Sequence, residues 1–161
     1  MSSFSFTDQD GQAFGTDELT DTIWIADFIF TQCDTVCLPM MSETAALQQQ
    51  FKEEGLPVEF VSFTVDPTVD SPKILKDYIG QYTDDESNWH MLTGYSQKEI
   101  EAFARDTFKT IIIKPESSYQ VLHGTSFYLV NQQGIVVNEY NYANSAYMDE
   151  LIKDIKKISN S

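Results

Sequence analysis

Residues 22–41 read TIWIADFIFTQCDTVCLPMM and contain both cysteines of the chain, Cys33 and Cys37. Before the cysteines, Thr22 to Phe30 form an apolar run of strand length, broken only by one aspartate, which is typical of a strand buried on both faces of a sheet. After them, Met40 to Glu54 have the apolar spacing of a helix. The pattern predicts that both cysteines lie where a buried strand leads into a helix.

The rest of the chain predicts an α/β fold. The further expected elements are a hairpin over 3–14, a strand over 58–65, helices over 72–82, 96–108 and 145–158, short strand segments over 89–93, 110–113 and 119–122, and a hairpin of strands 125–130 and 135–140. Strands joined by helices imply parallel pairing with right-handed crossovers, and the late hairpin adds antiparallel strands. We therefore expect a central mixed sheet with helices on both faces and an extra N-terminal hairpin, in the order of the thioredoxin fold.

Length and charge limit the function classes. At 161 residues the chain is expected to form a single domain over residues 1–161. It carries 25 acidic and 10 basic side chains, a net charge of −15, which excludes nucleic acid as a partner because phosphates require a basic face. The sequence shows no signal-peptide pattern, so either the protein is cytosolic or an N-terminal segment has been removed.

The position of the two cysteines indicates a functional site. In open α/β sheets, sites form beyond the carboxyl ends of the strands. The partial positive charge of a helix N-terminus favours a thiolate over a thiol there. A spacing of four places Cys33 and Cys37 within reach of each other, which permits a disulfide without requiring one. A disulfide switch and a metal site both remain open at this point.

His123 is the candidate third group of this site. It precedes the strand that begins near Ser126, and in a thioredoxin-like sheet that strand lies beside the one leading to the cysteines. Thr125 is expected at the position where the thioredoxin family has a cis-proline, so a feature that helps an oxidoreductase to reject metals is missing. Two thiolates and one imidazole suit Cu(I), Cu(II) or Zn(II), and copper binds more tightly than zinc to such a donor set.

Other residues receive less weight. His90 is expected to be structural, and Met40 and Met41 are expected to pack the first turn of the helix rather than bind metal. Asp66 is equally consistent with a turn residue and with a residue that supports the site from outside the ligand shell. A thioredoxin-fold peroxidase would need a cation beside its cysteine, and the single arginine, Arg105, is far from the cysteines in sequence.

Several motifs together resemble the Sco (SenC) family of copper-binding, thioredoxin-like proteins, and most closely its members from Gram-positive bacteria. The motifs that carry the resemblance are FIFTQCDTVCLPM at 28–40, VSFTVDP at 61–67, SPKILKDYI at 71–79, WHMLTG at 89–94 and HGTSFYLVNQQG at 123–134. The resemblance covers roughly residues 4 to 158. Asp34 and Leu38 depart from it, because they stand where the family often has proline.

The resemblance implies that Cys33, Cys37 and His123 are copper ligands and that Asp66 matches the family's acidic residue near the site. It also implies assembly of the dinuclear copper centre of cytochrome c oxidase, by delivery of copper, by reduction of that centre's cysteines, or by both. Family members are anchored to the membrane outside the cytoplasm. On this basis the chain is expected to be the soluble domain of an anchored protein.

The leading hypothesis is a copper-binding assembly factor, or metallochaperone, rather than a turnover enzyme. We expect it to be a monomer whose partners are the copper-centre subunit and a thiol reductant or copper donor. The alternative is a thiol–disulfide oxidoreductase with no essential metal, in which Cys33 attacks and Cys37 resolves. His123 separates the two hypotheses, because only the first one needs it.

Overall fold

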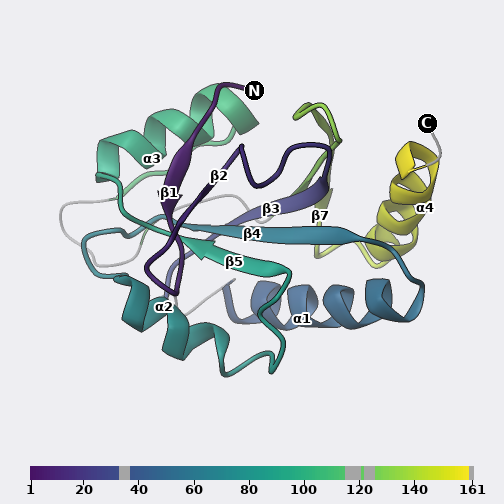
Figure 1. The fold of residues 1–161 in the computed structure, drawn as a ribbon, viewed down its shortest axis with the longest axis horizontal. Helices are drawn as coiled ribbons and strands as arrows, with labels where there is room; N and C mark the ends of the chain where they lie inside the picture. Colours follow the sequence, from purple (N-terminus) through teal and green to yellow (C-terminus); the bar gives the residue numbers. More distant parts are fainter. Residues whose placement is uncertain (33–36, 115–120, 122–125, 160–161) are drawn as a thin grey trace.

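A computed structural model describes residues 1–32, 37–114, 121 and 126–159, with residues 37 and 38 described by their backbone alone. Its main sheet has five strands in the order β5-β4-β3-β6-β7 (Figure 1). The strands are β3 (Ile23–Ile29), β4 (Val58–Thr64), β5 (Trp89–Leu92), β6 (Ser126–Val130) and β7 (Val136–Asn141). β3, β4 and β5 run parallel, whereas β6 is antiparallel to β3 and β7 is antiparallel to β6. The predicted mixed sheet is confirmed.

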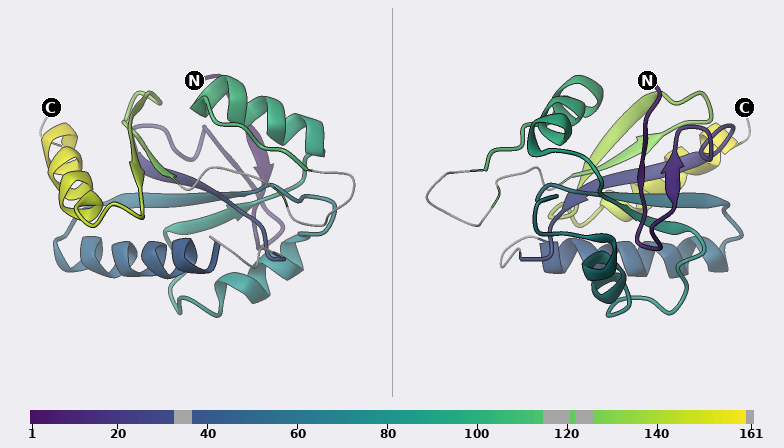
Figure 2. Two further views of the ribbon diagram at one scale, coloured as in Figure 1. Left: turned by 180° about the vertical axis from the view of Figure 1, so that it is seen from behind. Right: turned by 60° about the vertical axis from the view of Figure 1, so that its left-hand side comes forward.

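Helices cover both faces of this sheet, as predicted. They are α1 (Cys37–Glu53), α2 (Pro72–Ile79), α3 (Gln97–Phe103) with one wider helical turn η1 (Ala104–Phe108), and α4 (Tyr147–Ser159). In Figures 1 and 2, α1 and α2 lie on one face, and α3 lies on the other. An ion pair joins α4 to the residue that follows α1, with Lys156 Nζ 3.1 Å from Glu54 Oε1. The capping residues were visible in the sequence: Ser71 accepts a hydrogen bond from the Ile74 amide at 3.3 Å.

The predicted N-terminal hairpin forms from β1 (Ser5–Thr7) and β2 (Ala13–Gly15), which pair antiparallel. Its turn needs a positive φ of 78° at Gly11, which glycine adopts without strain. The hairpin joins the end of β5 through two backbone bonds between Thr7 and Thr93, of 2.9 and 2.8 Å. It thereby covers the α3 side of the sheet.

An aromatic cluster fills the space between the sheet, the hairpin and α3. Phe63 of β4 lies at its centre, with ring centroids 5.5 Å from Phe28, 5.1 Å from Phe103 and 5.8 Å from Phe4. Every residue of β3 is buried, which confirms the prediction of a strand covered on both faces. The core thus holds rigidly the strand that leads to the cysteines.

The predicted strand over 110–113 is reduced to a single β-bridge residue, Ile113. Lys109 takes the left-handed conformation, with φ of 57°, and the Thr110 amide closes the preceding helical turn on the Ala104 carbonyl at 3.2 Å. The chain beyond this reversal forms no named strand within the described residues, although Ile111 is 70% exposed and Ile112 is buried. The β-branched residues of this segment, which predicted a strand, therefore give only the bridge at Ile113. Of its expected partner segment over 119–122, only Val121 lies within the described residues.

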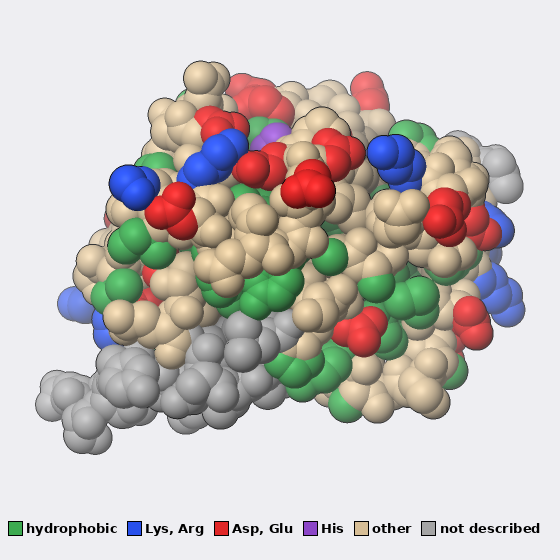
Figure 3. All heavy atoms as spheres, turned by 90° about the horizontal axis from the view of Figure 1, so that it is seen from below, with side chains coloured by type: hydrophobic (Ala, Val, Ile, Leu, Met, Phe, Trp, Pro, Cys, Tyr) green, Lys and Arg blue, Asp and Glu red, His purple; other side chains and the backbone are tan. Residues whose placement is uncertain are grey.

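The surface carries mixed charge on the face formed by α1 and α2, where Figure 3 shows lysines next to acidic side chains. Lys76 Nζ lies 2.9 Å from Asp10 Oδ1 and 3.0 Å from Glu86 Oε1. Such exposed pairs contribute little to stability. Among the residues that the structure describes, no helix is both long and apolar enough to cross a membrane.

The aromatic cluster gives a direct test of the core. Phe63→Ala is expected to lower the free energy of unfolding by about 3–5 kcal/mol, because it leaves a cavity among several rings. Chemical denaturation of the reduced protein measures this. Ile135→Ala, at a side chain that is 55% exposed, is the control and is expected to change stability by no more than about 0.5 kcal/mol. Equal losses in the two variants would contradict this description of the core.

Candidate metal centre

Three chain segments meet at the end of the sheet where its parallel strands finish, at the left in Figure 1. We call this end the sheet edge. β3 and β4 are parallel and their last pair is Ile29 with Thr64, so both strands end at this edge. β6 is antiparallel to β3, so its first residue, Ser126, lies at the same edge. α1 begins here at Cys37. The edge is thus where the segments expected to carry the site converge.

The cysteine segment is described up to Gln32 and again from Cys37, the first residue of α1. Cys33 lies outside the described residues. The first turn of α1 contains no acidic residue, so nothing in it offsets the partial positive charge of the helix N-terminus. Met40 and Met41 are fully buried, which agrees with their expected role in packing the start of the helix.

His123 also lies outside the described residues. The described chain on either side of it places Val121 in the core and Ser126 at the start of β6. Because Ala26 of β3 pairs with Tyr128 of β6, the beginning of β6 lies level with the end of β3. The chain therefore enters β6 beside the point where β3 leads toward the cysteines.

Asp66 lies in the turn that follows β4, and its side chain is buried. Lys114 Nζ donates to Asp66 Oδ1 at 2.7 Å and to Thr68 Oγ1 at 3.2 Å. The Asp66 amide donates to Thr64 Oγ1 at 3.1 Å, and its carbonyl accepts the amides of two later residues of the turn. Asp66 is therefore both a turn residue and one half of a largely buried ion pair. This pair fixes the chain just before the segment that contains His123.

Asp70 is a second buried carboxylate in the same turn. Its Oδ1 accepts a hydrogen bond from Thr31 Oγ1 at 2.5 Å, and its Oδ2 accepts bonds from the Thr31 amide at 3.1 Å and from Thr64 Oγ1 at 2.6 Å. Burial raises the pKa of the Asp70 carboxyl above its ordinary value, the bonds from Thr31 and Thr64 oppose the rise, and the charge of Asp66 adds to it. The turn after β4 is thus bonded directly to the chain that leaves β3.

The second histidine, His90, occupies a different setting. It lies on β5, its ring stacks on Phe14 at a centroid distance of 3.9 Å, and its Nε2 is 3.4 Å from Glu59 Oε2. Across the described ranges 1–32, 37–114, 121 and 126–159, no group of three or more His, Cys, Asp and Glu side chains could hold a metal ion. A peroxidase would require a cation beside its cysteine. The side chain of Arg105 is instead exposed, and its Nε lies 3.1 Å from Asp106 Oδ1.

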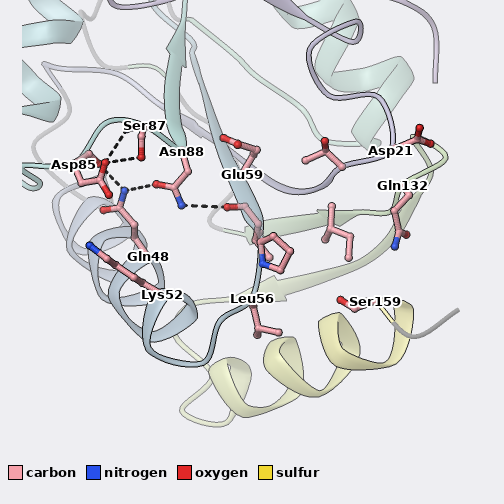
Figure 4. A pocket seen from close by; sticks show the side chains of 14 residues that line it. Asp21, Gln48, Lys52, Leu56, Glu59, Asp85, Ser87, Asn88, Gln132 and Ser159 are labelled. Carbon is pink, nitrogen blue, oxygen red and sulfur yellow. Dashed lines mark hydrogen bonds between the residues drawn. The ribbon is translucent and has the colours of Figure 1, made fainter.

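A hollow of about 540 Å³ lies at the opposite end of the sheet, where β3 and β4 begin (Figure 4). Gln48 Nε2 donates to Asn88 Oδ1 at 2.6 Å and to the Asp85 carbonyl at 2.7 Å, and Asn88 Nδ2 donates to the Val58 carbonyl at 3.2 Å. These amides of the lining bond to other residues of the same lining. The hollow is therefore separate from the edge where the strands end.

The family model described as SCO1/SenC matches residues 1–160, almost the whole chain. The chain belongs to the SCO1/SenC family. The SCO1 protein homolog of Bacillus subtilis is 45% identical over 156 residues, which cover 97% of this chain and 81% of that protein.

Solved Sco structures agree with this membership and with the predicted fold. A SCO1/SenC family lipoprotein from Bacillus anthracis is 47% identical with a TM-score of 0.95, covering 99% of this chain and 94% of that one. The structure of BsSco, a member of the Sco family of cytochrome c oxidase assembly proteins with an identified disulfide switch, is 44% identical with a TM-score of 0.89, covering 98% and 92%. Arabidopsis thaliana ScoI was solved with copper bound; it is 26% identical with a TM-score of 0.81, covering 97% and 98%.

Sequence reasoning about this Sco chain missed Asp70, Thr31 and Lys114. One signal was available for Asp70: it follows Asp66 by four residues within the turn that ends a buried strand, so both carboxylates belong to the same edge. No comparable signal marks Lys114, which is 48 residues from Asp66 in sequence. Its role depends on the tertiary fold.

The ion pair of Asp66 with Lys114 can be tested by removing its cation. Lys114→Met is expected to lower the free energy of unfolding by about 1–3 kcal/mol, because it leaves the Asp66 carboxylate buried without its partner. Urea denaturation measures this. Adding Asp66→Asn to Lys114→Met should recover part of the loss, since no unpaired charge then remains buried.

Lys76→Met is the control for this experiment, since Lys76 forms ion pairs whose members are all more exposed than Asp66. It should destabilise the protein less than Lys114→Met does. An equal or larger loss in Lys76→Met would contradict the importance of the buried pair.

Proposed function

We propose that this chain is a copper-binding assembly factor for the dinuclear copper centre of cytochrome c oxidase. It binds one copper ion through the thiolates of Cys33 and Cys37 and the imidazole of His123. Copper is its cargo, taken from a donor and passed to the copper-centre subunit. Asp66 supports the site from outside the ligand shell.

The observation that carries this proposal is the meeting of three segments at one sheet edge. The chain leaving β3 toward Cys33, the start of α1 at Cys37, and the chain entering β6 from the side of His123 all belong to this edge. Residues from distant parts of the sequence can therefore contribute to one site. A redox pair alone would need only the first two segments.

The donor set fits copper. Soft thiolates favour Cu(I), and imidazole accepts either oxidation state, so two sulfurs and one nitrogen can hold the ion through a change of charge. The N-terminus of α1 favours the deprotonated thiols that bind metal. The Asp66 carboxylate already accepts a bond from Lys114, which suits a residue that orients its surroundings rather than a ligand.

Transfer proceeds by ligand exchange. The open coordination position left by a three-ligand site admits a ligand of the partner, after which the imidazole and the thiolates leave in turn. No electron is exchanged in this route. Once the copper has left, a disulfide-bearing partner can oxidise the two thiols to a disulfide by taking up their two electrons and two protons, and this stops rebinding until a thiol reductant restores the thiols.

A thiol–disulfide oxidoreductase is the second candidate, favoured by the disulfide switch of BsSco. Here the Cys33 thiolate attacks a disulfide of the copper-centre subunit and forms a mixed disulfide, and Cys37 then displaces the partner. The S–S bond of the partner breaks as the one between Cys33 and Cys37 forms. Two electrons pass to the partner's sulfurs, which take up the two protons released by Cys33 and Cys37.

We further propose that the protein works as a monomer on the extracytoplasmic face of the membrane, held by an anchor. The relative from Bacillus anthracis is a lipoprotein, which supports this location. The net charge of −15 argues against nucleic acid and fits a partner with a basic surface.

Adding Cu(II) to the reduced protein tests the copper proposal. A thiolate-to-copper charge-transfer band is expected to rise until about one copper is bound per chain. The band should be lost in Cys33→Ser, because a sulfur ligand is removed, and strongly weakened in His123→Ala. Titration followed by absorption spectroscopy measures this.

His90→Ala is the matched control, because it removes the other histidine of the chain and should leave the band unchanged. Absence of a band in the wild type would reject the copper site. A band of normal strength in His123→Ala would instead favour the oxidoreductase, in which His123 has no essential role.

A further inference from the structure

We propose that Asp70 is a positioning residue for the copper site, which it serves by holding the chain at Thr31, two residues before Cys33. The inference rests on the proposed function, in which Cys33 binds copper. Asp70 does not itself bind the metal. Its buried carboxylate fixes the direction in which the chain leaves the sheet toward the cysteine.

Both donors of Thr31 bind the same carboxylate. The hydroxyl donates to Asp70 Oδ1 at 2.5 Å and the amide donates to Oδ2 at 3.1 Å. Two bonds to one rigid planar group restrict both the backbone and the side-chain rotamer of Thr31. Hydrogen bonds to a charged acceptor are also stronger than those between neutral groups.

These bonds act where the sheet no longer holds the strand. The ladder of β3 with β4 ends at Ile29 and Thr64, and the Val65 amide donates to the Ile29 carbonyl at 2.8 Å. Thr31 lies beyond that last ladder bond. The carboxylate of Asp70 therefore extends the fixed part of the chain by two residues toward Cys33.

Asp70 is itself held by bonds to its own turn, to β4 and to the chain that follows β5. Its amide donates to the Asp66 carbonyl at 3.0 Å, and its carbonyl accepts a bond from Thr93 Oγ1, next to β5, at 2.8 Å. Thr64, the last residue of β4, donates to its carboxylate at 2.6 Å. The following residue, Ser71, caps α2. Because Asp70 is held at several points, its carboxylate can fix the position of Thr31 through their two hydrogen bonds.

The burial of this carboxylate is costly, which argues for a role beyond filling space. Asp70 is 0% exposed, and among the described residues no lysine, arginine or histidine forms an ion pair with it. Apolar side chains of similar volume often stabilise a protein core better than buried charges do. A buried charge in place of an apolar side chain is therefore expected mainly where the residue serves a functional site. Asp70 lies at the sheet edge where the site is proposed.

The test removes one hydroxyl at a time. Thr31→Val deletes the donor to the Asp70 carboxylate and keeps the shape of the side chain, whereas Thr31→Ser keeps the hydroxyl. Thr93→Val is the matched control, because it deletes a buried hydroxyl that bonds the backbone of the same aspartate. Asp70→Asn, which cannot accept at both of its former oxygen positions, is the second variant if Thr31→Val does not fold.

Two measurements are made on each variant. Affinity for Cu(II) is measured by competition with a chelator, and amide hydrogen exchange of the peptide containing residues 31–37 is measured by mass spectrometry on the reduced, copper-free protein. Thr31→Val is expected to weaken copper binding by about tenfold, the lower end of what loss of supporting contacts costs a metal site. It should also speed exchange in that peptide. Thr31→Ser should behave like the wild type in both measurements. Thr93→Val removes one bond to the backbone of Asp70 but leaves both bonds between Thr31 and the carboxylate, so it should change both measurements less than Thr31→Val does.

The outcomes separate the two proposals. Unchanged copper affinity in Thr31→Val, or an equal loss in Thr93→Val, would overturn the role of Asp70 while leaving the copper site in place. If the wild type binds no copper, the proposed function fails, and hydrogen exchange alone tests whether Asp70 fixes the chain at Thr31. Equal exchange in Thr31→Val and Thr93→Val would then overturn it.

Discussion

The parallel pairing of β3 with β4 is the constraint on which the rest of the molecule depends. Seven consecutive pairs, from Ile23 with Val58 to Ile29 with Thr64, fix the register of two buried strands. Because a slip by one residue would turn the apolar side chains of a strand to the wrong face, burial on both sides keeps this register unique. The carboxyl ends of both strands therefore meet at one edge, and the polar residues that follow them meet there too.

Two carboxylates in the turn after β4 connect this edge to other parts of the chain. Asp70 binds Thr31 on the way to Cys33, and Asp66 binds Lys114 on the way to His123. Each interaction requires a buried carboxylate, and well-placed donors offset the free-energy cost of burying its charge. The turn thus links the two segments in which the proposed copper ligands lie. The conversion between the dithiol and the disulfide form, which the second candidate function needs, would act on the first of these segments.

The sequence predicted most of the fold, because its strongest patterns were local. The apolar run before Cys33, the caps at Ser71 and Ser96, and the hairpin at Gly11 each formed as expected. The segment 110–113 forms only a bridge at Ile113, although its β-branched residues predicted a strand, and the left-handed Lys109 had no signal in the sequence. The predicted ligands came from spacing and family motifs, whereas Thr31, Asp70 and Lys114 act through contacts that only the tertiary fold creates.

X-ray absorption at the copper edge of the loaded wild-type protein tests the central claim most directly, because it reports the atoms bound to the metal. The account predicts two sulfur ligands and one imidazole nitrogen around a single copper, with the sulfur signal reduced in Cys37→Ser and the imidazole signal lost in His123→Ala but kept in His90→Ala. A copper site that contains only nitrogen and oxygen ligands, or one that keeps its imidazole in His123→Ala, would contradict it.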